Sequence, residues 1–434
     1  MPLTFHLGWF SQIAGPVGWD HPSTEPEANW LEIDMYERMA KECERGKFDF
    51  ALIADHHGIS SDYGASIDSY VRYGLSVCHD STILAATIAA RTERLGVATT
   101  MSTSFIPPYH LARQLSTLDH LSRQRIAWNI VTSYNPNAFK NLGLDTVVPH
   151  DTRYDVADEY MELCFRLWSS WASDAVVMDR SEGRFADPGK VRPIDFVGSH
   201  YRSAGPLNMV PPKHGRPVTI QAGSSDRGMS FAARWADAVI VSKQTPGDLK
   251  AYRDDIVSRA VRFGRKPEDI KVFIIIKPVV ADTEAEAREL AGRPVTDLEV
   301  KKALATLSSR MNFDLSKLKL DEPVPSLNEK SIVGGQTTLS RHQTTSQRPT
   351  LREICRREII GNNLNITGTP EQVADRMQDI IEFVGGDGFA LRVNAHDHAY
   401  MRRFVDTVVP LLQKRGAVRK DYAGTSLRDH LTEF

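Results

Sequence analysis

The chain is poor in cysteine, and its cysteines lie far apart. They are Cys43, Cys78, Cys164 and Cys355. A disulfide framework or a zinc knuckle needs closely spaced cysteines, and no Cys-x-x-Cys pair occurs, so we expect neither. The histidines show no ligand spacing apart from His396 and His398, which have no partner motif. We therefore expect no metal site.

An excess of one charge is also missing. The 53 Lys and Arg residues nearly balance the 55 Asp and Glu residues, which gives a formal net charge of −2 at pH 7. A nucleic-acid-binding protein usually carries a basic excess, so we expect no nucleic-acid partner. No run of about 18 apolar residues occurs, so we expect no membrane span. The first residues, MPLTFHLGWF, do not resemble a secretory signal, and we expect a cytoplasmic protein.

Two common catalytic motifs are absent as well. The sequence has neither a Gly-x-Ser-x-Gly nucleophile elbow nor a Walker phosphate loop. Hydrophobic residues make up 41% of the 434 residues and charged residues 25%, which is typical of globular proteins. At about 150 residues per domain this length would give two or three domains, but single barrels also reach it.

Short apolar runs alternate with segments of helical periodicity along the whole chain. The predicted strands are Thr4–Trp9, Phe48–Ala54, Leu95–Thr100, Arg125–Val131, Val218–Ala222, Ala236–Val241, Val272–Val280 and Gly388–Val393. The predicted helices cover 29–45, 82–91, 111–121, 154–171, a short stretch from 226, 246–263, 370–383 and 404–415. Eight strands that alternate with helices predict an α/β fold, a (β/α)8 TIM barrel with insertions.

The extra length falls into three segments of this predicted barrel. Residues 10–28 and 172–216 are rich in Gly and Pro and are expected to form loops. Residues 285–368 add further helices and the polar stretch Ser326–Thr350. We interpret residues 1–434 as one domain and 285–368 as an insertion that covers the site as a lid, the alternative being a surface loop without a role.

Polar residues follow the predicted strands, where a TIM barrel builds its active site. Asp55, His56 and His57 follow the second strand, Thr100 ends the third and Asn129 lies on the fourth. We take His6, His56 and His57 as candidates for acid–base work at this rim, although a histidine in such a position is more often structural than catalytic.

The loop after the fifth strand reads Gln221-Ala-Gly-Ser-Ser225 and leads into a helix. Gly223 permits a tight turn, and Ser224 and Ser225 offer hydroxyl and amide groups. Because free N–H groups gather at a helix N-terminus, this loop predicts a phosphate site. The alternative is an ordinary capped turn between strand and helix.

Several motifs in this order resemble the bacterial-luciferase-like flavin monooxygenases. The resemblance is to the branch that contains nitrilotriacetate monooxygenase component A, EDTA monooxygenase, dibenzothiophene-sulfone monooxygenase, dimethylsulfide monooxygenase and pristinamycin IIA synthase. The motifs are Thr92–Gly96, Pro108–Arg113, Leu118–Ser122, Trp128–Ser133, His150–Tyr154, Leu167–Trp171, Gly205–Asn208, Gln221–Ser225, Gly368–Glu371 and Gly424–Arg428. They extend from the first strand region to the C-terminus.

The resemblance implies an enzyme that uses reduced FMN (FMNH2) and O2. A separate NAD(P)H:flavin reductase would supply the flavin, and a peroxyflavin would transfer one oxygen atom to a small organic substrate. The implied flavin contacts are Asp55, Thr100, Asn129, His150, Tyr154, Ser224 and Ser225. Members of the family usually form dimers or tetramers, so we expect a homodimer or homotetramer.

The resemblance leaves the substrate open. Trp9, Phe10, Trp19 and Tyr63 are predicted to form an aromatic pocket wall, with core packing as the alternative. We expect a nitrogen- or sulfur-containing or heteroaromatic compound. Two other functions stay open, namely F420-dependent hydride transfer on the same barrel and flavin binding without catalysis.

The chain departs from the family pattern in one turn. Relatives commonly carry Leu-Ser-Gly-Gly-Arg before the fourth strand, whereas this chain has Leu121-Ser-Arg-Gln-Arg125. The tight turn is therefore expected to form without glycine.

Overall fold

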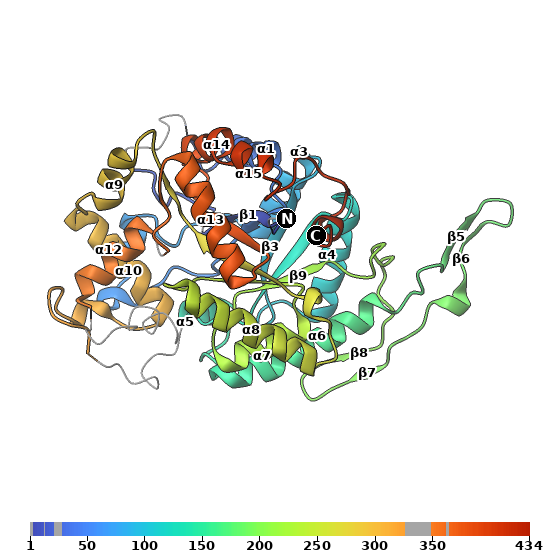
Figure 1. Ribbon diagram of the computed structural model, residues 1–434. Coiled ribbons are helices and arrows are strands. Elements are labelled where there is room, and N and C mark those ends of the chain that lie inside the picture. Colours follow the sequence, from blue (N-terminus) through green and yellow to red (C-terminus); the bar gives the residue numbers. More distant parts are fainter. Residues whose placement is uncertain (1–2, 13, 21–27, 326–348, 362–363) are drawn as a thin grey trace.

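The computed structural model describes residues 3–12, 14–20, 28–325, 349–361 and 364–434. Within these residues, eight parallel strands close into a barrel in the order β1-β14-β11-β10-β9-β4-β3-β2, which confirms the predicted fold (Figure 1). The barrel strands are β1 His6–Ser11, β2 Phe50–Ile53, β3 Gly96–Ser102, β4 Ile126–Val131, β9 Val218–Gln221, β10 Ala238–Val241, β11 Lys271–Ile276 and β14 Gly388–Arg392.

Side chains alternate between the inside of the barrel and the helices around it. Phe50 and Phe273 meet inside, with their ring centroids 4.8 Å apart. Their neighbours in sequence, Ala51 and Val272, face outward and pack against the helices. Because both faces of every strand are covered, the strands are nearly continuous apolar runs, which is why they could be found in the sequence.

The helices around the barrel bury one apolar face each. In α1 (Ile33–Arg45), Met35, Met39 and Cys43 are buried at four-residue spacing, and Gly46 ends the helix. The other helices of the outer layer are α3 Ser81–Arg91, α4 Pro108–Leu121, α6 His150–Trp168, α7 Asp226–Trp235, α8 Pro246–Arg262, α13 Pro370–Val384, α14 His398–Thr407 and α15 Val409–Lys414.

Some predicted boundaries were wrong, and proline accounts for two of them. The seventh strand ends at Ile276 because Pro278 cannot donate a ladder hydrogen bond, and β12 (Val279–Val280) pairs instead with β13 (Thr367–Gly368). The predicted last helix is divided into α14 and α15, with Pro410 in the first turn of α15.

Residues 172–216 are not only a loop. They contain the antiparallel pairs β5 (Val176–Asp179) with β6 (Arg184–Ala186), and β7 (Phe196–Val197) with β8 (Arg202–Ser203). The β5–β6 hairpin extends away from the barrel as an arm (Figure 1).

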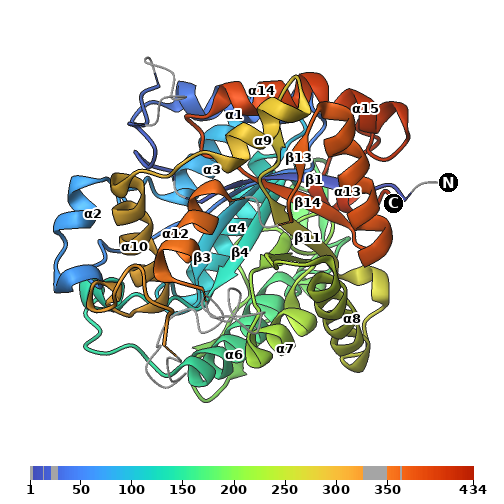
Figure 2. The same cartoon turned by 60° about the vertical axis from the view of Figure 1, so that its left-hand side comes forward.

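The described helices of the 285–368 segment gather on one side of the barrel (Figure 2). They are α9 Glu284–Gly292, α10 Asp297–Met311 and α12 Leu351–Ile360. The Tyr70 hydroxyl of α2 (Asp68–Arg72) donates to the Ala305 carbonyl oxygen at 2.9 Å, and Asn312 donates to the Tyr134 carbonyl oxygen at 2.7 Å. The segment is thus attached to loops that follow β2 and β4. Most of Ser326–Thr350 lies outside the described residues.

The turn before β4 forms without glycine, but under strain. Arg123 and Gln124 have φ angles of 59° and 65°, in the left-handed region that favours glycine. We expect Arg123→Gly to raise the free energy of unfolding by about 0.5–1 kcal/mol, because relief of left-handed strain exceeds the entropy that glycine adds to the unfolded chain. Urea denaturation measures this, and Lys41→Gly inside α1 is the contrasting control, expected to destabilise. A lower stability for Arg123→Gly would contradict the strain argument.

Candidate active site

Two helix N-termini meet at the carboxyl ends of β4 and β9. His150 is the first residue of α6, and Ser225 caps α7 by accepting a hydrogen bond from the Gly228 amide at 3.1 Å. The Nε2 atom of His150 lies 3.2 Å from the Ser225 hydroxyl oxygen, and the His150 and Tyr154 ring centroids are 5.1 Å apart. Ser224 precedes Ser225 in the same loop. Four of the predicted site residues therefore lie together, at a place where two helix dipoles favour an anion.

Glycine keeps this cradle open. A Cβ atom at Gly228 would lie 2.9 Å from the Ser225 hydroxyl oxygen and 3.0 Å from the Tyr154 hydroxyl oxygen. The Gln221 side chain donates to the Tyr154 hydroxyl at 3.3 Å, while its Oε1 atom is buried without a hydrogen-bond partner among the described residues. A buried acceptor without a donor is costly, so a ligand that donates a hydrogen bond to it would be stabilised.

Helix α8 holds the cradle in place from outside. The Tyr252 hydroxyl donates to the Gly223 carbonyl oxygen at 2.7 Å. The Arg259 guanidinium donates to the Asp226 carbonyl oxygen at 2.9 Å and to the Ser230 hydroxyl at 2.7 Å. These contacts fix the loop and the first turn of α7 before any ligand arrives.

Thr100 and Asn129 form a second polar group inside the barrel. The Asn129 amide donates to the Thr100 hydroxyl oxygen at 2.8 Å, and that hydroxyl donates to the Ile53 carbonyl oxygen at 2.6 Å. Both side chains are buried. The Oδ1 atom of Asn129 has no hydrogen-bond partner in the described part of the chain. The barrel interior thus contains one buried, unsatisfied acceptor beside Thr100.

Asp55 is engaged in a local structural role. Its carboxylate accepts hydrogen bonds from the His56 amide at 2.6 Å and from the Ser81 amide, the first of α3, at 2.9 Å. The Ser81 hydroxyl in turn donates to the Thr100 carbonyl oxygen at 2.9 Å. Asp55 therefore accepts from the first amide of α3, beside the N-cap residue Asp80, and is linked through Ser81 to the Thr100 group.

His56 and His57 lie at the mouth, as expected for residues that follow β2. Burial lowers the pKa of His56, with Asp55 opposing and Arg310 acting in the same direction as burial. His56 is therefore neutral at pH 7 and can donate or accept a hydrogen bond. The His57 ring packs against Phe105, with centroids 5.2 Å apart.

His6 was wrongly placed at the rim. It is the first residue of β1, at the amino end of the barrel, where its Nδ1 atom lies 2.9 Å from the Asp49 carboxylate. Its ring stacks on Phe434 at 4.4 Å. The strand begins two residues later than predicted, so His6 points into the opposite end and cannot act at the mouth.

His430 belongs to the same amino-end group and makes stability depend on pH. Burial lowers its pKa to about 4, with Arg419 adding to the shift and Asp49 opposing it. The unfolded chain therefore binds more protons than the folded one below pH 6.5, and stability falls as the pH drops toward 4. Between pH 7 and pH 5 we expect His430 to account for about 2 kcal/mol of lost unfolding free energy. Urea denaturation of His430→Gln at both pH values should show a smaller loss; an equal loss would contradict this assignment.

The predicted aromatic wall is only partly present. Trp9 faces the outer helices, fully buried, and its indole N–H donates to the Val393 carbonyl oxygen at 2.7 Å, so its placement in the pocket was wrong. Phe10, the next residue, faces the barrel interior. Trp19 is 60% exposed, so its side chain does not form a buried pocket wall in this structure. Tyr63 packs against the 285–368 segment.

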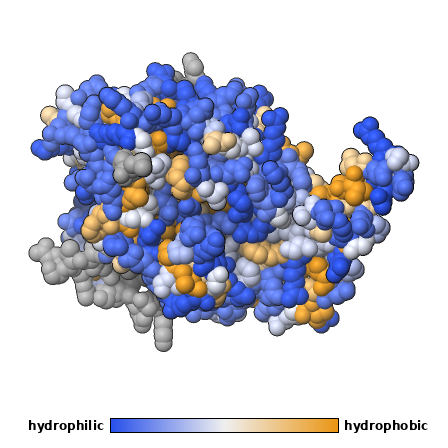
Figure 3. Space-filling model, turned by 45° about the vertical axis from the view of Figure 1, so that its right-hand side comes forward, coloured by the Kyte–Doolittle hydropathy of each residue, from blue (hydrophilic) through white to orange (hydrophobic). Residues whose placement is uncertain are grey.

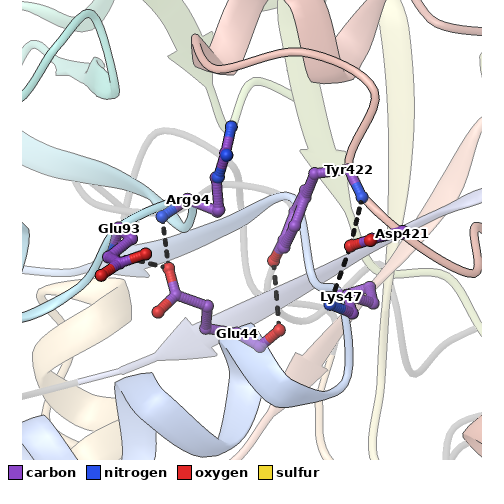
Figure 4. Close-up of a pocket in the computed structure, with 6 residues that line it drawn as sticks. All are labelled: Glu44, Lys47, Glu93, Arg94, Asp421 and Tyr422. Atoms are coloured by element: carbon purple, nitrogen blue, oxygen red, sulfur yellow. Dashed lines mark hydrogen bonds and ion pairs between the residues drawn. The ribbon is translucent and has the colours of Figure 1, made fainter.

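A polar cavity of about 280 Å³ lies at the other end of the molecule (Figure 4). Its lining residues are Glu44, Lys47, Glu93, Arg94, Asp421 and Tyr422. The Glu44 carboxylate accepts hydrogen bonds from the amides of Glu93, Arg94 and Leu95, and the Tyr422 hydroxyl donates to the Phe48 carbonyl oxygen at 2.7 Å. These groups connect the helix-to-strand loops at the amino end of the barrel. We therefore interpret the cavity as a structural feature and not as a binding site.

Within the described ranges, no three His, Cys, Asp or Glu side chains are grouped so that they could hold a metal ion. None of the helices described here is both long and apolar enough to span a membrane.

Residues 6–387 match the luciferase-like monooxygenase family, and the chain belongs to this family. It is a flavin-dependent monooxygenase. The dibenzothiophene-sulfone monooxygenase of Rhodococcus erythropolis (strain XP) is 37% identical, over 98% of this chain and 96% of that enzyme. Nitrilotriacetate monooxygenase component A of Aminobacter aminovorans is 33% identical, over 98% and 96%. A crystal structure of a riboflavin lyase with modified FMN and riboflavin superposes with a TM-score of 0.88 at 30% identity, covering 99% of this chain and 96% of that one.

Proposed function

We propose that this monooxygenase binds FMNH2, receives it from a separate NAD(P)H:flavin reductase, and inserts one oxygen atom of O2 into a small nitrogen- or sulfur-containing or heteroaromatic substrate. The name "component A" of the Aminobacter relative supports a two-component system. The modified FMN in the riboflavin lyase structure supports the choice of flavin.

The cradle between α6 and α7 fits the phosphate of FMN. Ser224 and Ser225 would provide hydroxyl and amide donors, and His150 and Tyr154 would close the other side. Gly228 leaves the space that a phosphate oxygen needs next to the Ser225 and Tyr154 hydroxyl groups. Both helix N-termini add a favourable field for a dianion.

The buried Oδ1 atom of Asn129 is the observation that carries the proposal. It is an acceptor without a described partner, beside Thr100 in the barrel floor. The ring of reduced flavin carries N–H donors, so a flavin over this floor would satisfy the acceptor. Asp55 would complete the contacts through the rigid segment between β2 and α3. Bound reduced flavin supplies the electrons with which O2 is activated.

The protein's own task at the mouth is then to orient the substrate and to exclude water. We propose residues 285–368 as the lid within a single domain of residues 1–434. Its attachment supports this, since the Ser309 and Ser60 hydroxyl oxygens lie 2.5 Å apart across the junction with the β2 loop. Phe10 and Tyr63 would line the substrate pocket, and His56 and His57 remain the candidates for hydrogen bonding or proton transfer to substrate.

We also propose a homodimer or homotetramer. The projecting β5–β6 arm carries Met178 at 62% and Phe185 at 54% exposure. Apolar residues are visible on this arm at the right of Figure 3. An isolated two-stranded hairpin is only marginally stable in water, so contact with another copy would stabilise it.

An anaerobic titration with FMNH2, followed by ¹⁸O2 and a panel of tertiary amines, thioethers and aromatic sulfones, tests the function. We expect micromolar or tighter binding of FMNH2 and one ¹⁸O atom in the product of at least one substrate class. Failure to bind FMNH2 would refute the proposal. Binding of FMNH2 with only hydrogen peroxide formed would favour the flavin-binding alternative, and a preference for reduced F420 would favour hydride transfer.

A further inference from the structure

Two basic side chains lie at the mouth of the barrel, at the carboxyl ends of neighbouring strands. Arg392 is the last residue of β14, and Lys277 directly follows β11. In the β1–β14 register Arg392 is level with Phe10. Arg392 is two residues beyond Ala390, which faces the barrel interior, so the strand alternation directs Arg392 inward.

Gly361, at the end of α12, brings the two cations together. A Cβ atom at Gly361 would lie 2.5 Å from an Arg392 guanidinium nitrogen and 3.5 Å from the Lys277 Cδ atom. Both side chains are partly buried under this helix end. The lid segment and the barrel rim therefore enclose one cationic corner.

The nearby carboxylates do not neutralise the positive charge of Lys277 and Arg392. Glu358 is shared, since its Oε2 atom lies 2.9 Å from Arg310 and 3.7 Å from Arg392. Lys277 makes no ion pair within the part of the chain that the structure describes; its ammonium lies 5.9 Å from the Tyr400 ring centroid. Burial lowers the pKa of Lys277, and Asp397 opposes this only from beyond ion-pair distance, while Arg392 and Arg293 add to it. A partly buried cation without a counterion would be stabilised by an anion.

We propose that Lys277 and Arg392 form a subsite for a carboxylate group of the substrate, whose apolar, oxidisable part packs toward Phe10. The inference rests on the proposed function, which places the substrate over this mouth. It concerns an anion other than the FMN phosphate, whose cradle between α6 and α7 is built on different strands. Charge-assisted hydrogen bonds to a carboxylate would fix the orientation of the substrate.

Binding of a matched pair of probes to the flavin-free protein tests the subsite. The probes are 4-(methylthio)benzoate and its uncharged amide, measured by isothermal titration calorimetry. We expect the carboxylate to bind at least 10-fold more tightly than the amide, and Lys277→Met to remove this preference. Lys277→Met breaks no described ion pair and should fold, whereas Arg392→Met would leave Glu358 with fewer partners. Lys271→Met removes the same charge from the amino end of β11 and should keep the preference.

Equal binding of the two probes, or a preference that survives Lys277→Met, would overturn the subsite. The same variants are titrated with FMNH2 under anaerobic conditions, and their affinity is expected to change less than 3-fold. A loss of FMNH2 affinity in Lys277→Met with an intact carboxylate preference would mean that these cations serve the flavin, which also overturns the proposal. Failure of the unaltered protein to bind FMNH2 would refute the proposed function alone, because the probe measurement needs no flavin.

Discussion

Gly228→Val is expected to weaken FMNH2 binding about 100-fold, or about 2.7 kcal/mol, while the fold is retained. The branched side chain would occupy the space between the Ser225 and Tyr154 hydroxyl groups, where a Cβ atom alone already comes within 2.9–3.0 Å. Valine has a better helix propensity than glycine, so α7 itself should not be weakened. Anaerobic fluorescence titration gives the affinity, and circular dichroism gives the melting temperature.

Gly247→Val is the matched control for this substitution. Gly247 lies in the first turn of α8, where the nearest atom to an added Cβ atom is the Thr245 hydroxyl oxygen at 3.8 Å. This variant should bind FMNH2 like the unaltered chain. If Gly228→Val also binds normally, the phosphate does not lie in the cradle between α6 and α7, and the flavin orientation proposed above is wrong.

Asp237→Ala is expected to lower the free energy of unfolding by about 3–5 kcal/mol, because it leaves buried cations without their partner. Asp237 directly precedes β10 and accepts hydrogen bonds from Arg216 at 2.6 and 2.8 Å and from Arg428 at 3.1 and 3.2 Å. It also accepts from the Thr219 amide at 2.9 Å. One carboxylate thus joins β9, β10 and the C-terminal helix α16 (Leu427–Leu431).

The pH dependence follows from the same contacts. Burial alone would raise the pKa of Asp237, but the Arg216 and Arg428 guanidinium groups outweigh burial and hold it far below its usual value. The stabilisation is therefore complete above the pKa of an unfolded aspartate, near 4, and is lost as the pH falls below it.

Asp254→Ala is the control, because it removes an ion pair that is exposed instead of buried. Asp254 pairs with Lys250 at 3.1 Å on the exposed face of α8, and exposed pairs of this kind contribute about 0.3–0.5 kcal/mol. Urea denaturation at pH 7 compares the two variants. A loss below 1 kcal/mol for Asp237→Ala would show that the buried network is not the joint between these elements.

The barrel could be predicted because burial on both faces makes its strands continuous apolar runs. Phe48–Ala54 and Gly388–Val393 were found within two residues of β2 and β14 for this reason. The predicted ends of strands and helices were wrong where a single proline sets them, as Pro278 and Pro410 do. The hairpins in residues 172–216 were missed because strands of two to four residues carry too little periodicity to be recognised.

Of the candidate site residues, the structure brings together those that the contiguous motifs supply. His150, Tyr154 and Ser225 are brought together as the motifs indicated, and Thr100 and Asn129 share a hydrogen bond. Lys277 directly follows β11 and Arg392 ends β14, but both lie inside the longer strands predicted as Val272–Val280 and Gly388–Val393, so the rule that selected Asp55 passed over them. The net charge of −2 says nothing about the charge at one place, whereas the two cations at the mouth are the basis of the proposed carboxylate subsite.

The amino-acid sequence by itself determined the barrel, the family and the loop before α7, because apolar periodicity and short contiguous motifs are local properties of the chain. Only the tertiary structure decided which face each side chain takes. One residue of register separates Trp9, buried outside the barrel, from Phe10, which points into it. The tertiary structure also decided that His6 lies at the amino end of the barrel, and that Gly361 of the insertion contacts Lys277 and Arg392. Such contacts join residues more than 30 positions apart, and no local pattern in the sequence encodes them.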